Sequence, residues 1–240
     1  MELKHTQVQV RSISFKLMTY THSLELCARM NFETENLDFI DDISCDDILY
    51  DLGACEGRFS LYAAKKGVKV ISFEPEEKNF KVLLQNIALN DFQPNQIEAI
   101  NAGVGAKTAA AVLNIGQPWE GGHQKVVKHN LVRNDLDFDF KEKQTIQLIA
   151  IDQFLEEEKG PFPDYLKIDI DGSELPFLEG AKKTLNNSNL KGIIFELSEL
   201  DSGFTKIIDI LKSYGFIERK RFPVPNEPKL YNIIFYKSNQ

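Results

Sequence analysis

Short apolar runs alternate with amphipathic stretches between residues 47 and 214, and this alternation constrains the fold more than any other feature of the chain. Short β-branched runs are typical of strands buried on both faces, and helices between them are typical of a parallel sheet. The predicted strands are 47–51, 68–74, 96–101, 165–169 and 192–196. The predicted helices are 57–66, 76–90, 173–185 and 204–214. The pattern therefore predicts an α/β fold.

The two ends of the chain depart from this alternation. Residues 7–18 alternate apolar and polar side chains in two registers, which predicts one or two half-buried strands, and a short helix is expected at 23–30. Residues 216–221 and 230–237 predict two strands joined by a Pro-rich turn. Because the connection is direct, these two strands are expected to be antiparallel.

One central segment does not fit the repeat either. Two strand-like runs, 109–115 and 145–151, flank a polar, glycine-containing loop at 117–143. A loop of this length in a compact domain is more often functional than idle. We therefore expect it to shape a ligand site.

Charge and composition narrow the class of ligand. The 240 residues include 28 basic and 36 acidic side chains, and the net charge of −8 opposes sequence-independent binding to nucleic acid or to an anionic membrane. The sequence shows no membrane-spanning apolar stretch, no secretory leader and no paired cysteine spacing. We expect a cytoplasmic protein with a small-molecule partner, built from an N-terminal cap segment, 1–46, and one domain, 47–240. The oligomeric state stays open.

The most informative motif joins the first predicted parallel strand to the helix that follows it. It reads Asp51-Leu-Gly53-Ala54-Cys55-Glu-Gly57. A strand, a glycine turn and a helix start bring backbone N–H groups close to a ligand at the carboxyl edge of a parallel sheet. Because Cys55 stands where a dinucleotide fold requires its middle glycine, the loop predicts a nucleotide-type site that holds no pyrophosphate.

An acidic residue ends the next predicted strand at the position expected of a ribose ligand. Glu74 follows Gly53 by 21 residues. An acid at that spacing, at the tip of the adjacent strand, is placed to accept hydrogen bonds from both ribose hydroxyls. A tight turn or a solvated acid explains either feature alone, but the two together predict an adenosine site.

Charged side chains alternate along the fourth predicted strand of this sheet. Lys167, Asp169 and Asp171 project to one side, and the two isoleucines between them project to the other. Polar groups at the end of a buried strand are costly unless they are paired or used, so we expect them to face the ligand cleft. The alternative is a Lys167–Asp169 ion pair, with Asp171 or Ser173 capping the next helix.

Four motifs occur in the order seen in FkbM-family methyltransferases, and the chain resembles this family over about residues 46–200. The motifs are Asp51-Leu-Gly-Ala-Cys-Glu-Gly57, Phe73-Glu-Pro75, Leu166-Lys-Ile-Asp-Ile-Asp-Gly-Ser-Glu174 and Phe195-Glu196. The resemblance implies a three-layer α/β/α sandwich with the Rossmann-like class I methyltransferase fold, in which a mostly parallel seven-stranded sheet ends in an antiparallel hairpin. It also implies methyl transfer from S-adenosylmethionine to a hydroxyl oxygen, commonly on a sugar or a natural product.

The resemblance also assigns a cofactor site. The glycine motif resembles the cofactor loop, Glu74 resembles the ribose clamp, and Asn101-Ala102-Gly103 resembles the adenine-side loop. The family usually has Asn where Cys55 stands and an aliphatic residue where Glu56 stands, and we expect Cys55 to line the site as a small side chain. The residues expected to bind the cofactor are Asp51, Gly53, Ala54, Cys55, Gly57, Glu74, Pro75, Asn101, Ala102 and Asp169.

Transfer to an alcohol oxygen requires a group that removes or redirects the hydroxyl proton. Asp169, Lys167 and His123 are the catalytic candidates. His123 follows Trp119-Glu-Gly-Gly in the long loop, and the ordinary pKa of histidine lies near 6.5. A solvated loop histidine is the alternative. His123 and Glu196 are expected to bind the acceptor, a small hydroxylated molecule for which a carbohydrate is the first candidate.

Three questions stay open at this level. Asp169 and Glu196 resemble the paired carboxylates that hold Mg²⁺ in some other class I O-methyltransferases, but hydrogen bonding of Glu196 to a sugar hydroxyl is an alternative. An NAD-dependent oxidoreductase would share the sheet and the strand-tip acid, although the chain lacks GxGxxG. A degenerate methyltransferase domain that acts as a binding partner is a further alternative, suggested by Cys55 and Glu56.

Overall fold

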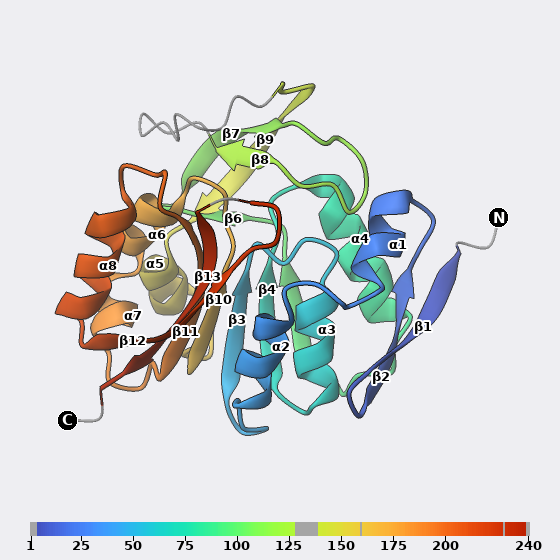
Figure 1. The fold of residues 1–240 in the computed structure, drawn as a ribbon, viewed down its shortest axis with the longest axis horizontal. Helices are drawn as coiled ribbons and strands as arrows, with labels where there is room; N and C mark the ends of the chain where they lie inside the picture. Colours follow the sequence, from blue (N-terminus) through green and yellow to red (C-terminus); the bar gives the residue numbers. More distant parts are fainter. Residues whose placement is uncertain (1–3, 128–138, 159, 228, 239–240) are drawn as a thin grey trace.

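A seven-stranded sheet forms the centre of the molecule (Figure 1). The computed structural model describes residues 4–127, 139–158, 160–227 and 229–238. The strands of the sheet, in spatial order, are β12 (Phe216–Pro223), β13 (Leu230–Lys237), β11 (Gly192–Ser198), β10 (Tyr165–Ile168), β3 (Ile48–Leu52), β4 (Lys69–Phe73) and β5 (Ile97–Ile100). The five strands from β11 to β5 are parallel, and β13 runs antiparallel to both of its neighbours. The predicted parallel sheet and C-terminal hairpin are therefore confirmed.

Helices cover both faces of this sheet. One face packs against α5 (Ile151–Glu157), α6 (Glu174–Gly180), α7 (Lys182–Asn186) and α8 (Phe204–Ser213). The other face packs against α2 (Thr34–Asp41), α3 (Arg58–Lys65) and α4 (Glu77–Ala88). Alternate residues of β3 pack against the two helical layers. Tyr50 and Leu52 are buried with α5 to α8, and Leu49 is buried with α2 to α4. This arrangement is the predicted three-layer sandwich.

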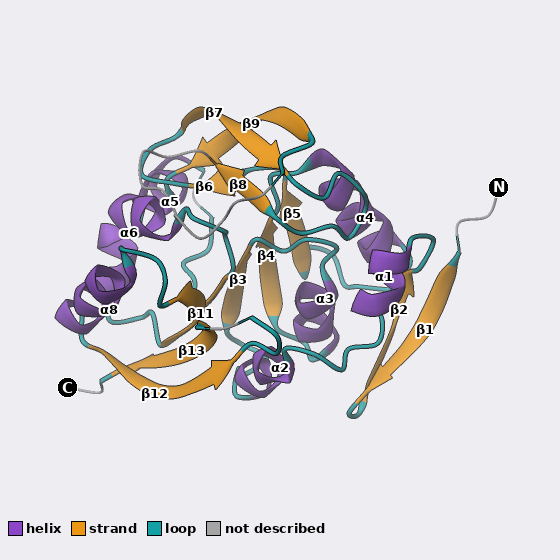
Figure 2. Ribbon diagram, turned by 45° about the horizontal axis from the view of Figure 1, so that its top comes forward, coloured by secondary structure: helices purple, strands orange, loops and turns teal. Residues whose placement is uncertain are grey.

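The N-terminal segment packs onto the second of these layers. A hairpin of β1 (His5–Val10) and β2 (Ile13–Met18) lies against α3 and α4, and α1 (His22–Cys27) follows it (Figure 2). Phe15 and Phe39 are buried in the same core as β3 and α3. The hairpin and α1 confirm the predicted elements, whereas α2 was not predicted. The division at residue 46 stays a prediction.

A second sheet stands beside the carboxyl ends of the central strands. Its order is β6 (Gly103–Val104), β9 (Glu142–Ile149), β7 (Ala109–Ile115) and β8 (Lys125–Val127). The predicted strand at 109–115 is confirmed, but the one at 145–151 is displaced, because Ile151 begins α5, which was not predicted. The predicted loop at 117–143 holds β8 and the start of β9, and residues 128–138 lie outside the described part.

The predicted helix at 173–185 is two helices instead of one. Ala181 separates α6 from α7 with φ −124° and ψ 21°, which is not helical. The carboxylate of Asp152, on α5, accepts hydrogen bonds from Lys183 N (2.8 Å) and Thr184 N (2.9 Å) at the start of α7. A side chain 31 and 32 positions away in sequence therefore stabilises a new helix start, which local periodicity cannot reveal.

A buried polar row crosses the centre of the sheet. Lys167 on β10 lies in register beside Asp51 on β3, and their charged atoms, Nζ and Oδ1, are 3.2 Å apart. Ser60 donates a hydrogen bond to Asp51, and Ser72 on β4 donates to Ser60. Burial lowers the pKa of Lys167, but the charges of Asp51 and Asp169 outweigh it and raise the pKa overall. Lys167 therefore stays charged inside the protein.

No helix in the described part of the chain is long and apolar enough to cross a lipid bilayer.

Removing Lys167 would leave Asp51 buried without its cation. We expect Lys167→Met to lower the free energy of unfolding by about 3–5 kcal/mol, measured by urea titration, because an uncompensated buried charge remains. Lys183→Met, which breaks an exposed ion pair with Glu156, is the control and should leave the urea midpoint unchanged. Equal midpoints for the two variants would contradict a structural role for the buried pair.

Candidate active site

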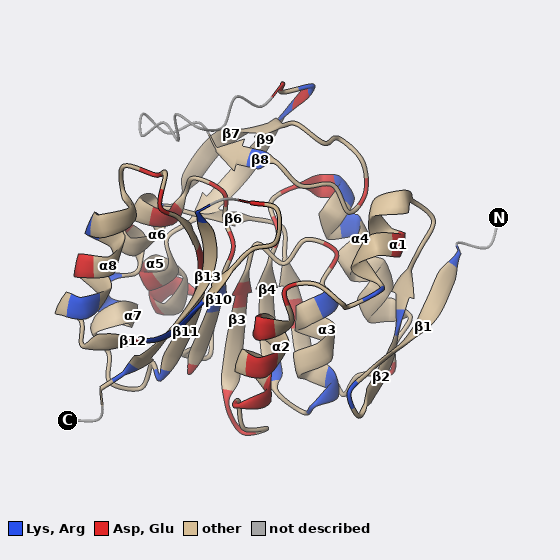
Figure 3. Ribbon diagram, viewed as in Figure 1, with Lys and Arg blue, Asp and Glu red and all other residues tan. Residues whose placement is uncertain are grey.

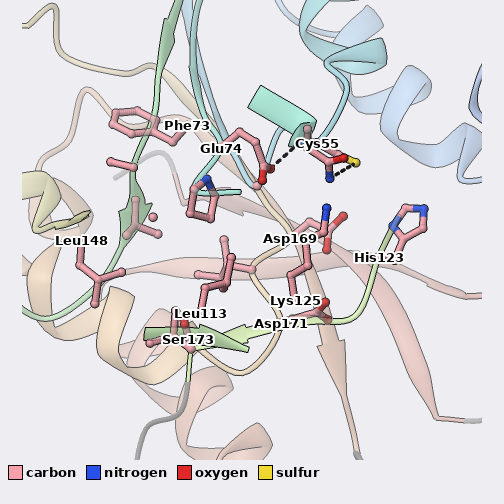
Figure 4. A pocket seen from close by; sticks show the side chains of 18 of the residues that line it. Cys55, Phe73, Glu74, Leu113, His123, Lys125, Leu148, Asp169, Asp171 and Ser173 are labelled. Carbon is pink, nitrogen blue, oxygen red and sulfur yellow. Dashed lines mark hydrogen bonds between the residues drawn. The ribbon is translucent and has the colours of Figure 1, made fainter. Parts of the chain in front are cut away.

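A pocket opens where the strand order reverses between β3 and β10. Ligands of parallel α/β sheets bind at such a switch point, outside the carboxyl ends of the strands. Figure 4 shows apolar Phe73 and Leu148 at one end of this switch-point pocket and polar Glu74, Asp169 and His123 towards the other. The predicted site residues that line it are Gly53, Cys55, Glu74, Pro75, Ala102, His123 and Asp169.

The glycine loop is fixed to the neighbouring strands by backbone contacts. Gly53 N and Ala54 N both donate to the carbonyl of Phe73, at 2.9 and 3.0 Å, which ties the end of β3 to β4. Gly53 has φ +83°, and a Cβ atom there would lie 1.8 Å from the carbonyl oxygen of Asp169. Only glycine satisfies both conditions. The loop therefore reaches the end of β10 as closely as two backbones can pack.

Glu74 leaves the end of β4 and points across the pocket. Its two carboxylate oxygens accept hydrogen bonds from Cys55 N and Glu76 N, each at 2.9 Å. Burial raises the pKa of Glu74 to about 7, against the charge of Lys125 and the two amide hydrogen bonds, which lower it. The carboxylate is therefore held at the floor of the pocket, with lone pairs still available to a hydroxylated ligand.

Two polar pocket residues were not predicted from the sequence. Lys125 on β8 is largely buried and forms an ion pair of 2.9 Å with Glu76, the N-cap of α4. Asn79, which is 1% exposed, donates to Cys55 Sγ and to Gly122 O, and its Oδ1 accepts from Gly121 N. Asn79 lies three positions after Glu76 on the helix that follows the ribose-type acid, and Lys125 lies two after His123. Closeness in sequence to these residues was the only sign in the sequence that Asn79 and Lys125 belong to the pocket.

Several predicted residues support the pocket without lining it. Asp51 and Lys167 form the buried ion pair beneath it, and Asn101 donates to the carbonyls of Glu74 and Pro75. Gly57 is the N-cap of α3. The predicted residues outside the lining of the pocket are Asp51, Ala54, Gly57, Asn101, Lys167 and Glu196. Their roles in binding or catalysis stay predictions.

Asp169 lies just beyond the end of β10, with 37% of its side chain exposed. Lys167 Nζ is 3.8 Å away, so the charge pair foreseen as an alternative is present, although Lys167 lies nearer to Asp51. Partial desolvation raises the pKa of Asp169, Lys167 opposes that rise, and the charges of Glu33 and Asp171 add to it. Burial and the charge of Asp169 also raise the pKa of Glu196 on β11.

Ser173 occupies the N-cap position of α6, but its side chain makes no capping hydrogen bond there. Both Asp171 and Ser173 line the pocket. Together with Glu74 and Asp169, Asp171 forms a group of acidic residues on the loops at this edge of the sheet (Figure 3). Within the described residues, no group of three or more His, Cys, Asp or Glu side chains is placed to hold a metal ion.

His123 sits on a loop that is tied to both α1 and α4. Trp119 Nε1 donates to Ser23 Oγ at 2.9 Å, Gly121 N donates to Asn79, and His123 N donates to Gln117 Oε1 at 3.0 Å. His123 is exposed at the surface of this loop, but desolvation by the protein groups around the ring and the nearby charge of Arg58 both lower its pKa. The imidazole is therefore neutral at pH 7 and can accept a proton.

His123 also borders a second cavity, which we name the α1 cavity. Its lining consists of Ser23, Leu26, Cys27, Arg29, Asn31, Phe32, Gln117 and His123. Since His123 lines both hollows, it stands at their boundary.

The fold and the pocket together define a class of protein. A parallel sheet with this strand order, an antiparallel pair at one edge, and a glycine loop with a strand-tip acid at the switch point make up the Rossmann-like class I methyltransferase fold. The sequence matches the methyltransferase FkbM domain over residues 51–218, and the chain belongs to this family.

Two curated proteins are related to the chain in sequence. The hexuronic acid methyltransferase AglP of Haloferax volcanii is 25% identical over 158 residues, which cover 66% of this chain and 57% of AglP. The methyltransferase sdnD of Sordaria araneosa is 24% identical over 202 residues, which cover 74% of this chain and 76% of sdnD. The match thus spans little more than half the length of AglP.

Solved structures show the same fold. A methyltransferase FkbM from Methylobacillus flagellatus superposes with a TM-score of 0.55 at 20% identity, covering 81% of this chain and 44% of that one. A precorrin-6y C5,15-methyltransferase from Geobacter metallireducens superposes with a TM-score of 0.50 at 13% identity, covering 85% and 87%. The architecture is therefore shared with enzymes of low sequence identity.

The surroundings of His123 predict how its ring titrates. We expect an imidazole pKa below the ordinary 6.5, because the protein groups around this exposed residue partly desolvate the charged ring and Arg58 repels it. An NMR pH titration of the ring protons measures this value, and the His123→Gln variant identifies the resonance. A pKa at or above 6.5 would mean that the ring is solvated.

Proposed function

We propose that this protein transfers a methyl group from S-adenosylmethionine to a hydroxyl oxygen of a small molecule, a sugar or a natural product. The observation that carries the proposal is Glu74, a buried carboxylate at the tip of β4 that faces a pocket beside a glycine loop. Family membership supports methyl transfer. The related AglP, a hexuronic acid methyltransferase, supports a sugar as the acceptor.

The residues of the switch-point pocket fit the cofactor. Glu74 is placed for the ribose hydroxyls, and the apolar side chains of Ala102, Val104 and Leu148 offer a surface for adenine. Asp169 carries a carboxylate at the polar end, where it suits a positive sulfonium. Because a cation there lowers the pKa that burial has raised, cofactor binding and ionisation of Asp169 favour each other.

The chemistry requires alignment and one proton acceptor. S-adenosylmethionine supplies a methyl group on a positive sulfur, so an oxygen–carbon bond forms as the carbon–sulfur bond breaks and its electron pair stays on sulfur. The protein must hold the hydroxyl oxygen in line with that bond and take up the hydroxyl proton. We assign this proton to His123, whose neutral ring borders both hollows. Lys167 is then a positioning residue, because its ammonium group is buried between Asp51 and Asp169.

Glu74 provides the direct test of the cofactor site. We expect Glu74→Gln to weaken binding of S-adenosylhomocysteine by ~10-fold or more in calorimetric titration, because hydrogen bonds to a charged acceptor are lost. Wild-type affinity should also fall as the pH drops through about 7, where Glu74 takes up a proton, and the variant should lack that dependence.

Glu77→Gln is the matched control for this test, because Glu77 lies on the same helix start but is exposed. It should bind S-adenosylhomocysteine as the wild type does. Binding of NAD without binding of S-adenosylhomocysteine would overturn the proposal in favour of a dehydrogenase.

Two further variants separate chemistry from cofactor binding. With saturating acceptor, His123→Gln should lower kcat by about 10²–10⁴-fold, because the proton acceptor is lost. Asp169→Ala should abolish transfer. Both should keep the affinity for S-adenosylhomocysteine, which lacks the positive charge that Asp169 faces. Wild-type turnover in either variant would remove that residue from the mechanism, and absence of transfer by the wild type to any hydroxylated acceptor would favour a binding role for the domain.

A further inference from the structure

The α1 cavity lies next to the switch-point pocket and shares His123 with it. Its walls come from segments far apart in the sequence, namely α1 with the residues that follow it and the loop that carries Gln117. Two hydrogen bonds join these segments. Trp119 Nε1 donates to Ser23 Oγ, and Thr21 Oγ1 donates to Glu120 O. The walls of the cavity are therefore held together by hydrogen bonds between the two segments.

The two hollows differ in charge. Glu74, Asp169 and Asp171 line the switch-point pocket, whereas none of the described residues that line the α1 cavity is acidic. The carboxylates of Glu33 and Glu56 lie close to this cavity, and both are paired with Arg58. Arg29 is exposed at this cavity and lies one helical turn after Glu25, which feels its charge, but no ion pair within the described residues engages it. Because Glu33 and Glu56 are paired with Arg58, and Glu25 with Lys4, the exposed guanidinium of Arg29 can meet an anionic group of a ligand.

The remaining walls suit a polyhydroxylated ring. Phe32 offers an aromatic side chain, held in place by the Arg58 guanidinium 4.3 Å from its ring centre, and Arg58 is itself paired with Glu33. Gln117 accepts a hydrogen bond from His123 N through its Oε1, so its amide group remains a donor. Asn31 adds a second amide. Aromatic faces with a few convergent polar groups are typical of small-molecule sites.

We propose that the α1 cavity binds the methyl acceptor, and that this acceptor is a sugar bearing a carboxylate, which Arg29 pairs. This inference rests on the proposed function. A single guanidinium matches one carboxylate bidentately, whereas a phosphate carries about two negative charges and would leave one unpaired here. With the carboxylate at Arg29 and the ring beside Phe32, a ring hydroxyl faces His123 at the boundary with the switch-point pocket.

The test uses sugars that differ only in the anionic group. Protein saturated with S-adenosylhomocysteine is titrated with methyl glucuronide and methyl galacturonide, each against its neutral glycoside, and with glucose 6-phosphate, by ligand-observed NMR. We expect at least one uronide to bind ~10-fold more tightly than its neutral partner. That preference should shrink as NaCl is raised, because Arg29 is exposed to solvent.

Arg29→Gln should remove the preference for the uronide, and Arg29→Lys should keep part of it, because a lysine retains the charge without the planar fork. Arg219→Gln is the matched control: Arg219 is also exposed, but it lies on β12 beside Tyr165 and Lys191. That variant should bind uronides as the wild type does. All three variants should keep the wild-type affinity for S-adenosylhomocysteine, which shows that they fold.

The outcomes separate the two proposals. If S-adenosylhomocysteine binds but neither uronide exceeds its neutral glycoside, or Arg29→Gln keeps the preference, the acceptor proposal is overturned and the proposed function stands. Tighter binding of glucose 6-phosphate than of either uronide overturns the choice of carboxylate. If S-adenosylhomocysteine does not bind to the wild type, the proposed function itself fails, and with it the acceptor assignment.

Discussion

The buried ion pair between Asp51 and Lys167 is the constraint on which the site depends. It joins β3 to β10 across the switch point, and Ser60 and Ser72 extend it to α3 and β4. A slip of either strand by one residue would turn one charge to the opposite, apolar face, so the register of the central strands is specified. Because the register is fixed, the ends of β3, β4 and β10 meet at one level, and the pocket forms there.

Much of this architecture follows from local sequence. The strands of a parallel sheet are read from short apolar runs, and their carboxyl ends necessarily share one edge. Gly53, Glu74 and Asp169 are therefore brought together by topology alone, which is why their common location was predictable. The orientation of single side chains was harder to predict. Lys167 lies beneath the pocket because it pairs with Asp51 on the neighbouring strand.

The features that escaped prediction depend on distant contacts. The break between α6 and α7 depends on the carboxylate of Asp152, which caps the start of α7. The strand β8 forms because it pairs with β7, although its own sequence gives no strong strand signal. Lys125 enters the pocket only through that pairing. The α1 cavity likewise joins residues 23–32 to residue 117, and no spacing rule links segments that far apart.

Asn79 shows how such a protein can change its specificity. Its amide holds both Cys55 in the glycine loop and the Gly121–Gly122 turn, so one buried side chain anchors the two ligand-facing loops together. None of these hydrogen bonds involves α1 or the residues that follow it. Apart from Thr21 and Ser23, which hydrogen-bond to the loop that holds this turn, positions of the N-terminal segment can therefore change during divergence without disturbing the anchor, so the α1 cavity can diverge separately from the glycine loop.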